Sequence, residues 1–142
     1  MDAVVNAQEN GANGIMMLPP MRYSADKRGT LTFYEVVAKS VDLPIMVYNN
    51  PIDYKIEITL DMFDELAKYD NIQSVKESTR DVTNVTRMRN NFGNRFKILC
   101  GVDTLALEEL LLGTDSKAGG YDYLLLFTQG KMVSAKISAI EV

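Results

Sequence analysis

Two residues with reactive side chains, Lys76 and Tyr48, each end a short apolar run, residues 72–75 and 43–47 respectively. A lysine amine that is withdrawn from water at the tip of a buried strand is favoured in its neutral form. A neutral amine attacks carbonyl carbons and forms a Schiff base. A tyrosine hydroxyl at the tip of a nearby strand could move the protons of such a reaction. The pair therefore predicts Schiff-base chemistry, with Lys76 as the nucleophile and Tyr48 as the acid and base.

Structural roles are the alternative for each of these residues. Lys76 could be a strand-end lysine that reaches solvent, and Tyr48 could lie at the edge of the core with its hydroxyl in water. The segment Asn49-Asn50-Pro51 is as consistent with a simple turn as with a ligand contact. Cys100 is expected to be an inert, buried thiol.

Composition restricts the classes of protein and site. The 142 residues suffice for one domain with a core, and the net charge of −4 without a basic stripe argues against nucleic-acid binding. Histidine is absent and Cys100 is the single cysteine, which excludes a histidine-activated nucleophile, a histidine metal site and an internal disulfide. No segment is apolar enough to span a bilayer, and the N-terminus does not resemble a signal peptide. We expect a cytoplasmic protein that needs no metal or organic cofactor.

Four apolar runs, separated by segments with apolar residues at helical spacing, give the chain a strand–helix rhythm. This alternation predicts an α/β protein with a parallel sheet. The starts of three helices are expected near Thr30, Thr59 and Asp81, which could act as caps. In such sheets, sites lie at the carboxyl ends of the strands, where the candidate residues fall. The expected strands are residues 14–18, 43–47, 72–75 and 96–100.

Several short motifs, in this order and spacing, resemble the dihydrodipicolinate synthase / N-acetylneuraminate lyase family. They are Gly11-Ala12-Asn13-Gly14, Leu18-Pro19-Pro20, Tyr48-Asn49-Asn50-Pro51, Lys76-Glu77-Ser78 and Gly101-Val102-Asp103 with Leu112-Gly113. The resemblance implies a partial TIM (β/α)8 barrel of about four consecutive βα units over residues 1–113. Residues 114–142 are expected to form a divergent tail and not a separate domain.

The same resemblance assigns roles to individual residues. Lys76 falls on the Schiff-base lysine, Tyr48 on the proton-relaying tyrosine, and Gly101 on a glycine that lines the pocket beside the imine. Asn49 and Pro20 complete the expected substrate-binding set. The implied reaction is a lyase or hydro-lyase reaction on pyruvate-like 2-oxo acids, as in keto-deoxy sugar-acid dehydratases or hydroxyproline-pathway deaminases.

The chain also departs from the family pattern. A complete barrel takes about 250 residues, and the family's first strands, which carry the hydroxyl pair for the substrate carboxylate, are absent. Met21 and Arg22 stand where the family often has a tyrosine, with Tyr23 shifted in position, and Asp53 stands where the synthases have an arginine. We therefore expect a truncated copy whose activity is impaired. The alternative is a non-catalytic remnant or interaction module.

An incomplete barrel predicts self-association. Four βα units would leave two sheet edges open and the inner sheet face uncovered. We expect a homo-oligomer that covers these surfaces. The residues expected on or beside the inner face are Ile15, Met17, Ile45, Val47 and Ile98.

Overall fold

Helices and strands alternate along the first part of the chain, as the apolar pattern predicts. The computed structural model describes residues 2–21, 25–117, 123–128, 131–136 and 138–139, with side chains up to residue 117. The helices are α1 (Asp2–Glu9), α2 (Lys27–Ser40), α3 (Pro51–Tyr54), α4 (Leu60–Leu66), α5 (Thr83–Phe92), the 3-10 helix η1 (Asp103–Leu105) and α6 (Ala106–Leu111). The strands are β1 (Ile15–Met17), β2 (Ile45–Asn49), β3 (Ile72–Glu77), β4 (Lys97–Cys100), β5 (Ser116–Lys117), β6 (Tyr123–Thr128), β7 (Lys131–Lys136) and β8 (Ser138–Ala139).

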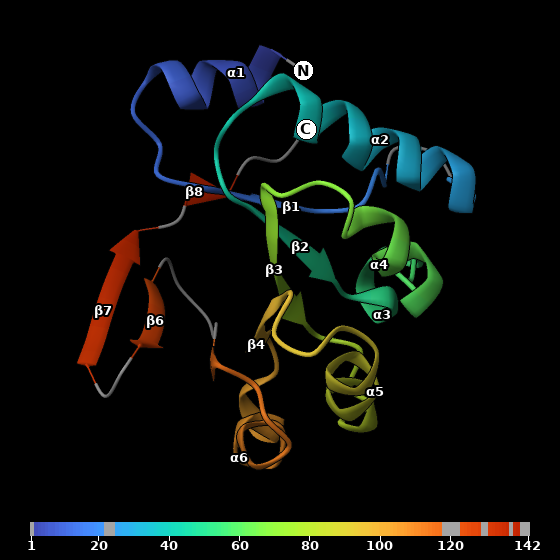
Figure 1. Ribbon diagram of the computed structural model, residues 1–142, viewed down its shortest axis with the longest axis vertical. Coiled ribbons are helices and arrows are strands. Elements are labelled where there is room, and N and C mark those ends of the chain that lie inside the picture. Colours follow the sequence, from blue (N-terminus) through green and yellow to red (C-terminus); the bar gives the residue numbers. More distant parts are fainter. Residues whose placement is uncertain (1, 22–24, 118–122, 129–130, 137, 140–142) are drawn as a thin grey trace.

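The strands of the described residues form one sheet in the order β7-β6-β5-β4-β3-β2-β1-β8 (Figure 1). Strands β1 to β5 are mutually parallel and follow the chain order, which is the arrangement of a partial TIM barrel. The consecutive run β1–β5 therefore holds one strand more than the four expected, because Ser116 and Lys117 pair with Leu99 and Cys100.

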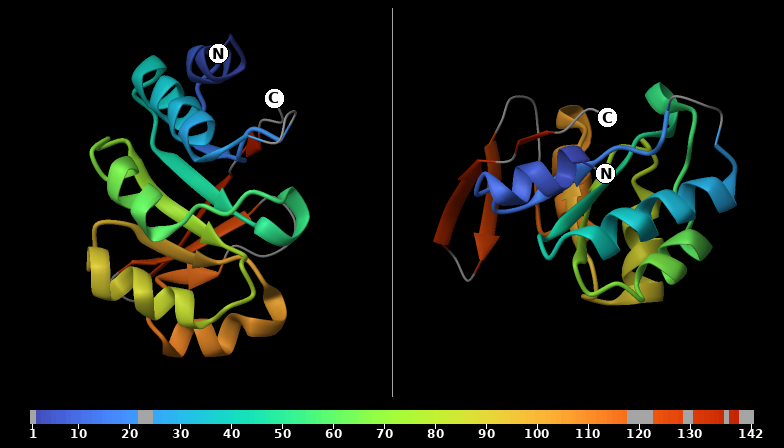
Figure 2. Two further views of the ribbon diagram at one scale, coloured as in Figure 1. Left: turned by 90° about the vertical axis from the view of Figure 1, so that its right-hand side faces the viewer. Right: turned by 90° about the horizontal axis from the view of Figure 1, so that it is seen from above.

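The two faces of the parallel sheet are different. Helices α2, α4 and α5 lie on one side, and the hairpin β6–β7 lies on the other (Figures 1 and 2). The helix-covered face packs into the apolar core with residues such as Tyr34, Phe63 and Met88. The strand residues of this core are Ile15, Met17, Ile45, Val47, Ile72, Val75 and Ile98.

The expectation for the inner face was wrong. Ile15, Met17, Ile45, Val47 and Ile98 belong to the helix-covered core. The inner face instead carries the intervening residues of each strand. In the strand register, Met46 pairs with Ser74, Tyr48 pairs with Lys76, and Lys76 also pairs with Leu99. The apolar runs do not reveal which residues face inward, because both faces of β1 and β2 carry large apolar residues. Which alternate set packs against the helices depends only on how each strand is rotated about its axis.

Strand β3 contains one residue more than its neighbour. Ile45 pairs with Ile72, but Met46 pairs with Ser74, so Gln73 is left over and is exposed. Such a bulge changes the face on which the following side chains emerge. It allows both Ile72 to lie in the helix-covered core and Lys76 to lie on the inner face.

Helix starts differ in detail from the expected caps. Asp26, and not Thr30, caps α2, because its Oδ1 accepts a hydrogen bond of 2.7 Å from the Gly29 N–H. Thr30 lies fully buried inside the helix. Thr59 occupies the cap position of α4 without capping it through its side chain, and Asp81 accepts a bond from the Thr83 N–H at the start of α5.

The tail does not leave the edges of the parallel sheet open, contrary to expectation. Strand β6 pairs antiparallel with β5, and β8 pairs parallel with β1. The segment from Tyr121 to Phe127, for which strand and helix were both open, forms β6 from Tyr123 onward; Tyr121 lies outside the described residues. Among the described helices, none is long and apolar enough to cross a membrane.

Candidate active site

Lys76 and Tyr48 lie side by side on the inner face, at the carboxyl ends of β3 and β2. The two residues are register partners, and the Lys76 Nζ lies 4.4 Å from the centroid of the Tyr48 ring. Both side chains are half-buried. An ammonium over an aromatic face is attracted by the ring quadrupole, so the ring holds the amine at this position. The structure thus brings together an amine and a phenol at one end of the sheet.

Gly101 lies directly against the stem of Lys76. The Gly101 N–H donates to the Glu77 carbonyl oxygen at 2.7 Å. A Cβ at position 101 would overlap the Ser78 hydroxyl and lie 2.9 Å from that carbonyl oxygen and 3.0 Å from the Lys76 Cγ. Position 101 therefore accepts only a residue without a side chain while Lys76 keeps its present course.

The Tyr48 hydroxyl has a specific partner. It accepts a hydrogen bond of 3.2 Å from the Asn50 Nδ2, which also donates to the Asp53 Oδ2 at 2.7 Å. Tyr54 packs edge-on against the Tyr48 ring, with centroids 5.5 Å apart. The phenol is therefore held on three sides by Lys76, Tyr54 and Asn50.

Asn49 lies on the opposite face from Lys76, behind the sheet. Its Oδ1 accepts from the Ile58 N–H at 3.0 Å, and its Nδ2 donates to the Ile58 carbonyl oxygen at 3.2 Å. The residue is fully buried, so these two bonds fix the segment after α3 to the sheet. This geometry gives Asn49 a structural role in place of the expected substrate contact.

Two buried glutamates lie behind the strand ends, between the sheet and the helices. The Glu77 carboxylate accepts bonds of 2.8 Å from the Thr79 N–H and the Asn84 Nδ2. Burial raises the pKa of Glu77, although these hydrogen bonds oppose the rise. Glu77 thus anchors the loop that follows Lys76.

Glu109 of α6 is the second buried acid; among the described residues no nitrogen or oxygen donor bonds its carboxylate, and the weak thiol donor of Cys100 lies beside it. Burial raises the pKa of Glu109 to about 7, and the charge of Glu77 adds to this rise. Cys100 lies beside it and donates from its Sγ to the Val102 carbonyl oxygen at 3.2 Å. Burial raises the pKa of Cys100 to about 12, so the thiol is unreactive, as expected.

The remaining expected residues are less closely defined. Pro20 follows β1 at the same end of the sheet and is half-buried. Tyr23 and Arg22 lie outside the described residues. Within the described part of the chain, no group of histidine, cysteine or acidic side chains could hold a metal ion.

The sequence analysis named Asn50 as part of a turn or ligand contact and Asp53 as a departure from the family pattern, but it did not place either beside Tyr48. The signal that could have found them is their spacing, because Asn at a helix N-cap with an acid three residues later indicates reciprocal capping bonds. The proximity of the capping amide to Tyr48 follows only from the turn of the backbone after β2. No local pattern reports it.

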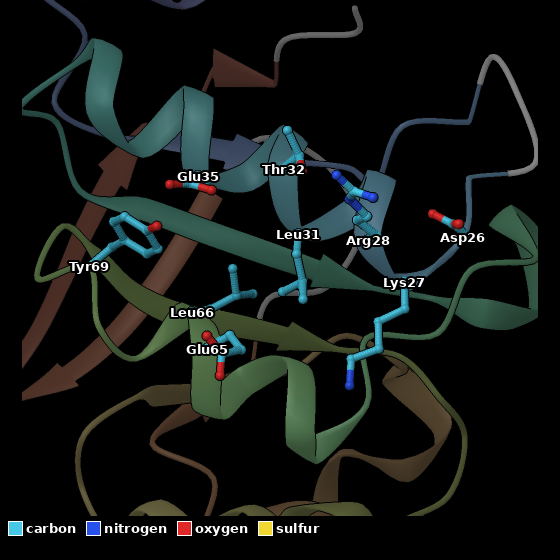
Figure 3. A pocket seen from close by; sticks show the side chains of 9 residues that line it. All are labelled: Asp26, Lys27, Arg28, Leu31, Thr32, Glu35, Glu65, Leu66 and Tyr69. Atoms are coloured by element: carbon cyan, nitrogen blue, oxygen red, sulfur yellow. The ribbon is translucent and has the colours of Figure 1, made fainter.

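A groove of about 480 Å³ lies elsewhere, between α2 and α4 on the outer surface (Figure 3). Leu31, Leu66 and Tyr69 line it together with charged residues. Glu35 is paired with Lys39 on α2, and Glu65 of α4 is paired with Lys68, which follows that helix. The groove is on the helix side, and we place the candidate site at Lys76 on the inner face because the reactive groups converge there.

Comparison with known proteins agrees with this geometry. The sequence profile described as "Dihydrodipicolinate synthetase family" matches residues 1–133, which extends beyond Gly113 into the tail. The 4-hydroxy-tetrahydrodipicolinate synthase of Aquifex aeolicus is 34% identical over 109 residues, covering 76% of this chain and 37% of that protein. That of Methanococcoides burtonii is 31% identical over the same length, covering 76% of this chain and 38% of that protein.

Solved structures show the same partial coverage. The crystal structure of dihydrodipicolinate synthase from Aquifex aeolicus superposes with a TM-score of 0.76 at 31% identity, over 80% of this chain and 39% of that one. The structure of CdNal from Clostridium difficile in complex with mannosamine gives a TM-score of 0.76 at 30% identity, over 83% and 41%. The chain thus spans about two fifths of the length of these relatives.

Proposed function

Because the chain belongs to the dihydrodipicolinate synthetase family, we propose that Lys76 forms a Schiff base with a pyruvate-like 2-oxo acid and that Tyr48 moves the protons. The observation that carries this proposal is the position of the Lys76 Nζ, 4.4 Å over the Tyr48 ring at the carboxyl ends of adjacent parallel strands. In parallel α/β barrels, this end of the sheet holds the reacting groups.

The chemistry follows from the two groups. The neutral amine of Lys76 adds to the 2-oxo carbon, and the carbonyl oxygen, after protonation, leaves as water to give an iminium. The iminium accepts the electron pair of a C–H or C–C bond at the adjacent carbon, which gives an enamine. The enamine can return the pair to expel a hydroxyl, protonated to water, from the following carbon, so a C–O bond there can break. The Tyr48 hydroxyl supplies or receives the proton at each step. Gly101 leaves room for the imine beside the Lys76 stem.

Within this chemistry we favour a sugar-acid dehydratase or a hydroxyproline-pathway deaminase over a synthase reaction. The observation that supports this preference is the carboxylate of Asp53, which lies against Asn50 at 2.7 Å. A second substrate carboxylate at this position would meet a like charge. No metal or organic cofactor enters the scheme, because the iminium itself serves as the electron sink.

The experiment is borohydride reduction in the presence of pyruvate, followed by peptide mass analysis. We expect one reduced pyruvate on Lys76 and none in Lys76→Ala, because no other amine in the described residues lies over Tyr48. Lys97→Ala is the matched control, since Lys97 lies on the same face at the far end of the neighbouring strand and should not affect the adduct. A folded protein without an adduct would support the alternative of a non-catalytic interaction module.

A further inference from the structure

Asn50 connects the Tyr48 hydroxyl to Asp53. Its side chain is only 5% exposed and all of its polar atoms are engaged. The Oδ1 accepts from the Asp53 N–H at 3.3 Å, and the Nδ2 donates both to the Asp53 Oδ2 and to the Tyr48 Oη. One amide group thus caps α3, pairs with an acid and contacts the phenol.

The orientation of this amide follows from its partners. A backbone N–H can only donate, so the atom of Asn50 that faces the Asp53 N–H is the oxygen. The NH₂ group then faces the Asp53 carboxylate, which only accepts when ionised, and the Tyr48 oxygen. Reversal of the amide would place oxygen against a carboxylate and NH₂ against N–H. The arrangement is therefore self-consistent in one orientation only.

A consequence for Tyr48 follows at once. Its oxygen receives a hydrogen from Asn50, so its own hydroxyl proton points away from Asn50. The ring is fixed by Tyr54 at its side and by the Lys76 amine on its face, which leaves the hydroxyl proton as the mobile part of the residue. We propose that Asn50, held by Asp53, is a positioning residue that directs the hydroxyl proton of Tyr48 toward a molecule bound at Lys76. This inference rests on the proposed function.

A pure capping role for Asn50 is the competing explanation, and an exchange of the two side chains separates them. In Asn50→Asp/Asp53→Asn, the carboxylate at position 50 still accepts from the backbone N–H, and the amide at position 53 still donates to it. The bond between positions 50 and 53 is kept, with donor and acceptor exchanged. At Tyr48, in contrast, the donor that faced the phenol oxygen is replaced by an acceptor. An oxygen now faces the hydroxyl, accepts its proton and draws it away from Lys76.

The first measurement is the exchange of the pyruvate methyl hydrogens for deuterium in D₂O, followed by NMR. Exchange requires the iminium at Lys76 and then removal and return of a proton at the adjacent carbon. We expect the double variant to lose at least about tenfold in the rate of deuterium exchange, as we also expect for Tyr48→Phe, while borohydride still traps pyruvate on Lys76. Asp26→Asn, the same change at the cap of α2, keeps its acceptor for the Gly29 N–H and should exchange at close to the rate of the unchanged protein. Equal rates in the unchanged protein and the double variant would overturn the positioning role.

The second measurement does not depend on activity. With ¹³Cζ-labelled tyrosine, the Tyr48 resonance is assigned from its loss in Tyr48→Phe, and its chemical shift reports the hydrogen bond at the hydroxyl. The double variant should move this resonance, whereas Asp26→Asn should leave it in place. An unmoved resonance contradicts the inference. Absence of a pyruvate adduct in the unchanged protein contradicts the proposed function instead, so the two failures are distinguishable.

Discussion

Lys76 and Glu77 are consecutive residues of β3, and their side chains lie on opposite faces of the sheet. The Lys76 amine lies over Tyr48 on the inner face, while the Glu77 carboxylate anchors Thr79 and Asn84 on the helix side. The hydrogen bonds of Glu77 therefore hold the end of the strand that carries Lys76. Gly101 packs against the backbone of Glu77 and the stem of Lys76, and it has no side chain that would displace them.

Gly101→Ala should therefore impair the site more than the fold. The added methyl group overlaps the Ser78 hydroxyl and crowds the Lys76 stem, which costs about 1–3 kcal/mol of stability and displaces the amine. We expect slower pyruvate trapping at Lys76 and a lower unfolding midpoint in urea. Adding Ser78→Ala removes the closest atom and should restore part of both.

Gly29→Ala is the matched control for this substitution. Its Cβ would meet the end of the Asp26 side chain at 3.3 Å and the Ala25 Cβ at an ordinary contact distance of 3.7 Å. Trapping in this variant should be unchanged. An equal loss of trapping in both glycine variants would show that the effect of Gly101→Ala is not local.

Much of the residue-level site could be predicted from the sequence, and the reason is physical. Parallel strands end at one edge, so residues that follow apolar runs must converge, which placed Tyr48 beside Lys76. What could not be predicted is the direction of each side chain. Asn49 precedes Asn50 by one residue, yet Asn49 binds Ile58 behind the sheet and Asn50 binds Tyr48. Neighbouring residues of one type differ here only by the alternation and the turn of the backbone.

Helix α6 shows how an element can combine opposite environments. Glu109 on its inner side is fully buried, whereas Leu107 and Leu111 on its outer side are 68% and 80% exposed. The polarity of this helix is thus the reverse of an ordinary amphipathic helix. The buried glutamate and the exposed leucines each lead to a testable prediction.

The buried acid should make stability fall as the pH rises. The pKa of Glu109 is raised by burial from an unfolded value of 4.5 to about 7, so between these values the folded state binds more protons than the unfolded state. Unfolding free energy is therefore highest below pH 4.5 with respect to this group and decreases up to about pH 7, by on the order of 2–3 kcal/mol. Glu77, whose pKa is also raised, contributes with the same sign.

Urea titrations from pH 5 to pH 8 test this expectation. Glu109→Gln should flatten the dependence on pH and increase stability at pH 8. Glu108→Gln, a neighbour that is exposed, should follow the unchanged protein. A curve that keeps its full slope in Glu109→Gln would show that Glu109 is not ionised in this range.

At the scale of elements, the sequence predicted four strands and most helices within a few residues, because their apolar periodicity is undisturbed. It assigned the inner and outer faces of the strands incorrectly. Met16 and Met17, or Met46 and Val47, are equally apolar, so composition does not reveal which of them meets the helices. The start of α2 was also misplaced, because Thr30 and Asp26 are both plausible caps and only Asp26 reaches a free N–H.

At the scale of the whole molecule, the tail covers both edges of the β1–β5 sheet, with β6 on β5 and β8 on β1. The outermost strands of the described sheet are then β7 and β8. Our candidate surface for association is the exposed apolar side of α6, because its leucine side chains lie in water. Leu107 and Leu111 are four residues apart and adjacent on the helix.

We therefore expect association to depend on α6. Burial of two leucines contributes about 3–6 kcal/mol in total, enough to matter at micromolar concentration. Leu107→Glu/Leu111→Glu should lower the sedimentation coefficient toward that of a monomer. Val36→Glu, at an exposed apolar residue of α2, should leave it unchanged. A monomeric unchanged protein at these concentrations would refute the expected homo-oligomer.

The bulge at Gln73 changes the alternation of side chains along β3. In a regular strand, residues an even number of positions from Ile72 point to the helix side and residues an odd number away point to the inner face. Lys76 is four positions from Ile72. In a regular strand of these same residues, Lys76 would therefore lie on the helix side together with Ile72. The bulge at Gln73 shifts the alternation by one position between them, although Gln73 itself is exposed. If Gln73 instead paired in a regular ladder, either Ile72 would face the reactive surface or Lys76 would face the core, whereas deletion of Gln73 would keep both side chains on their present faces.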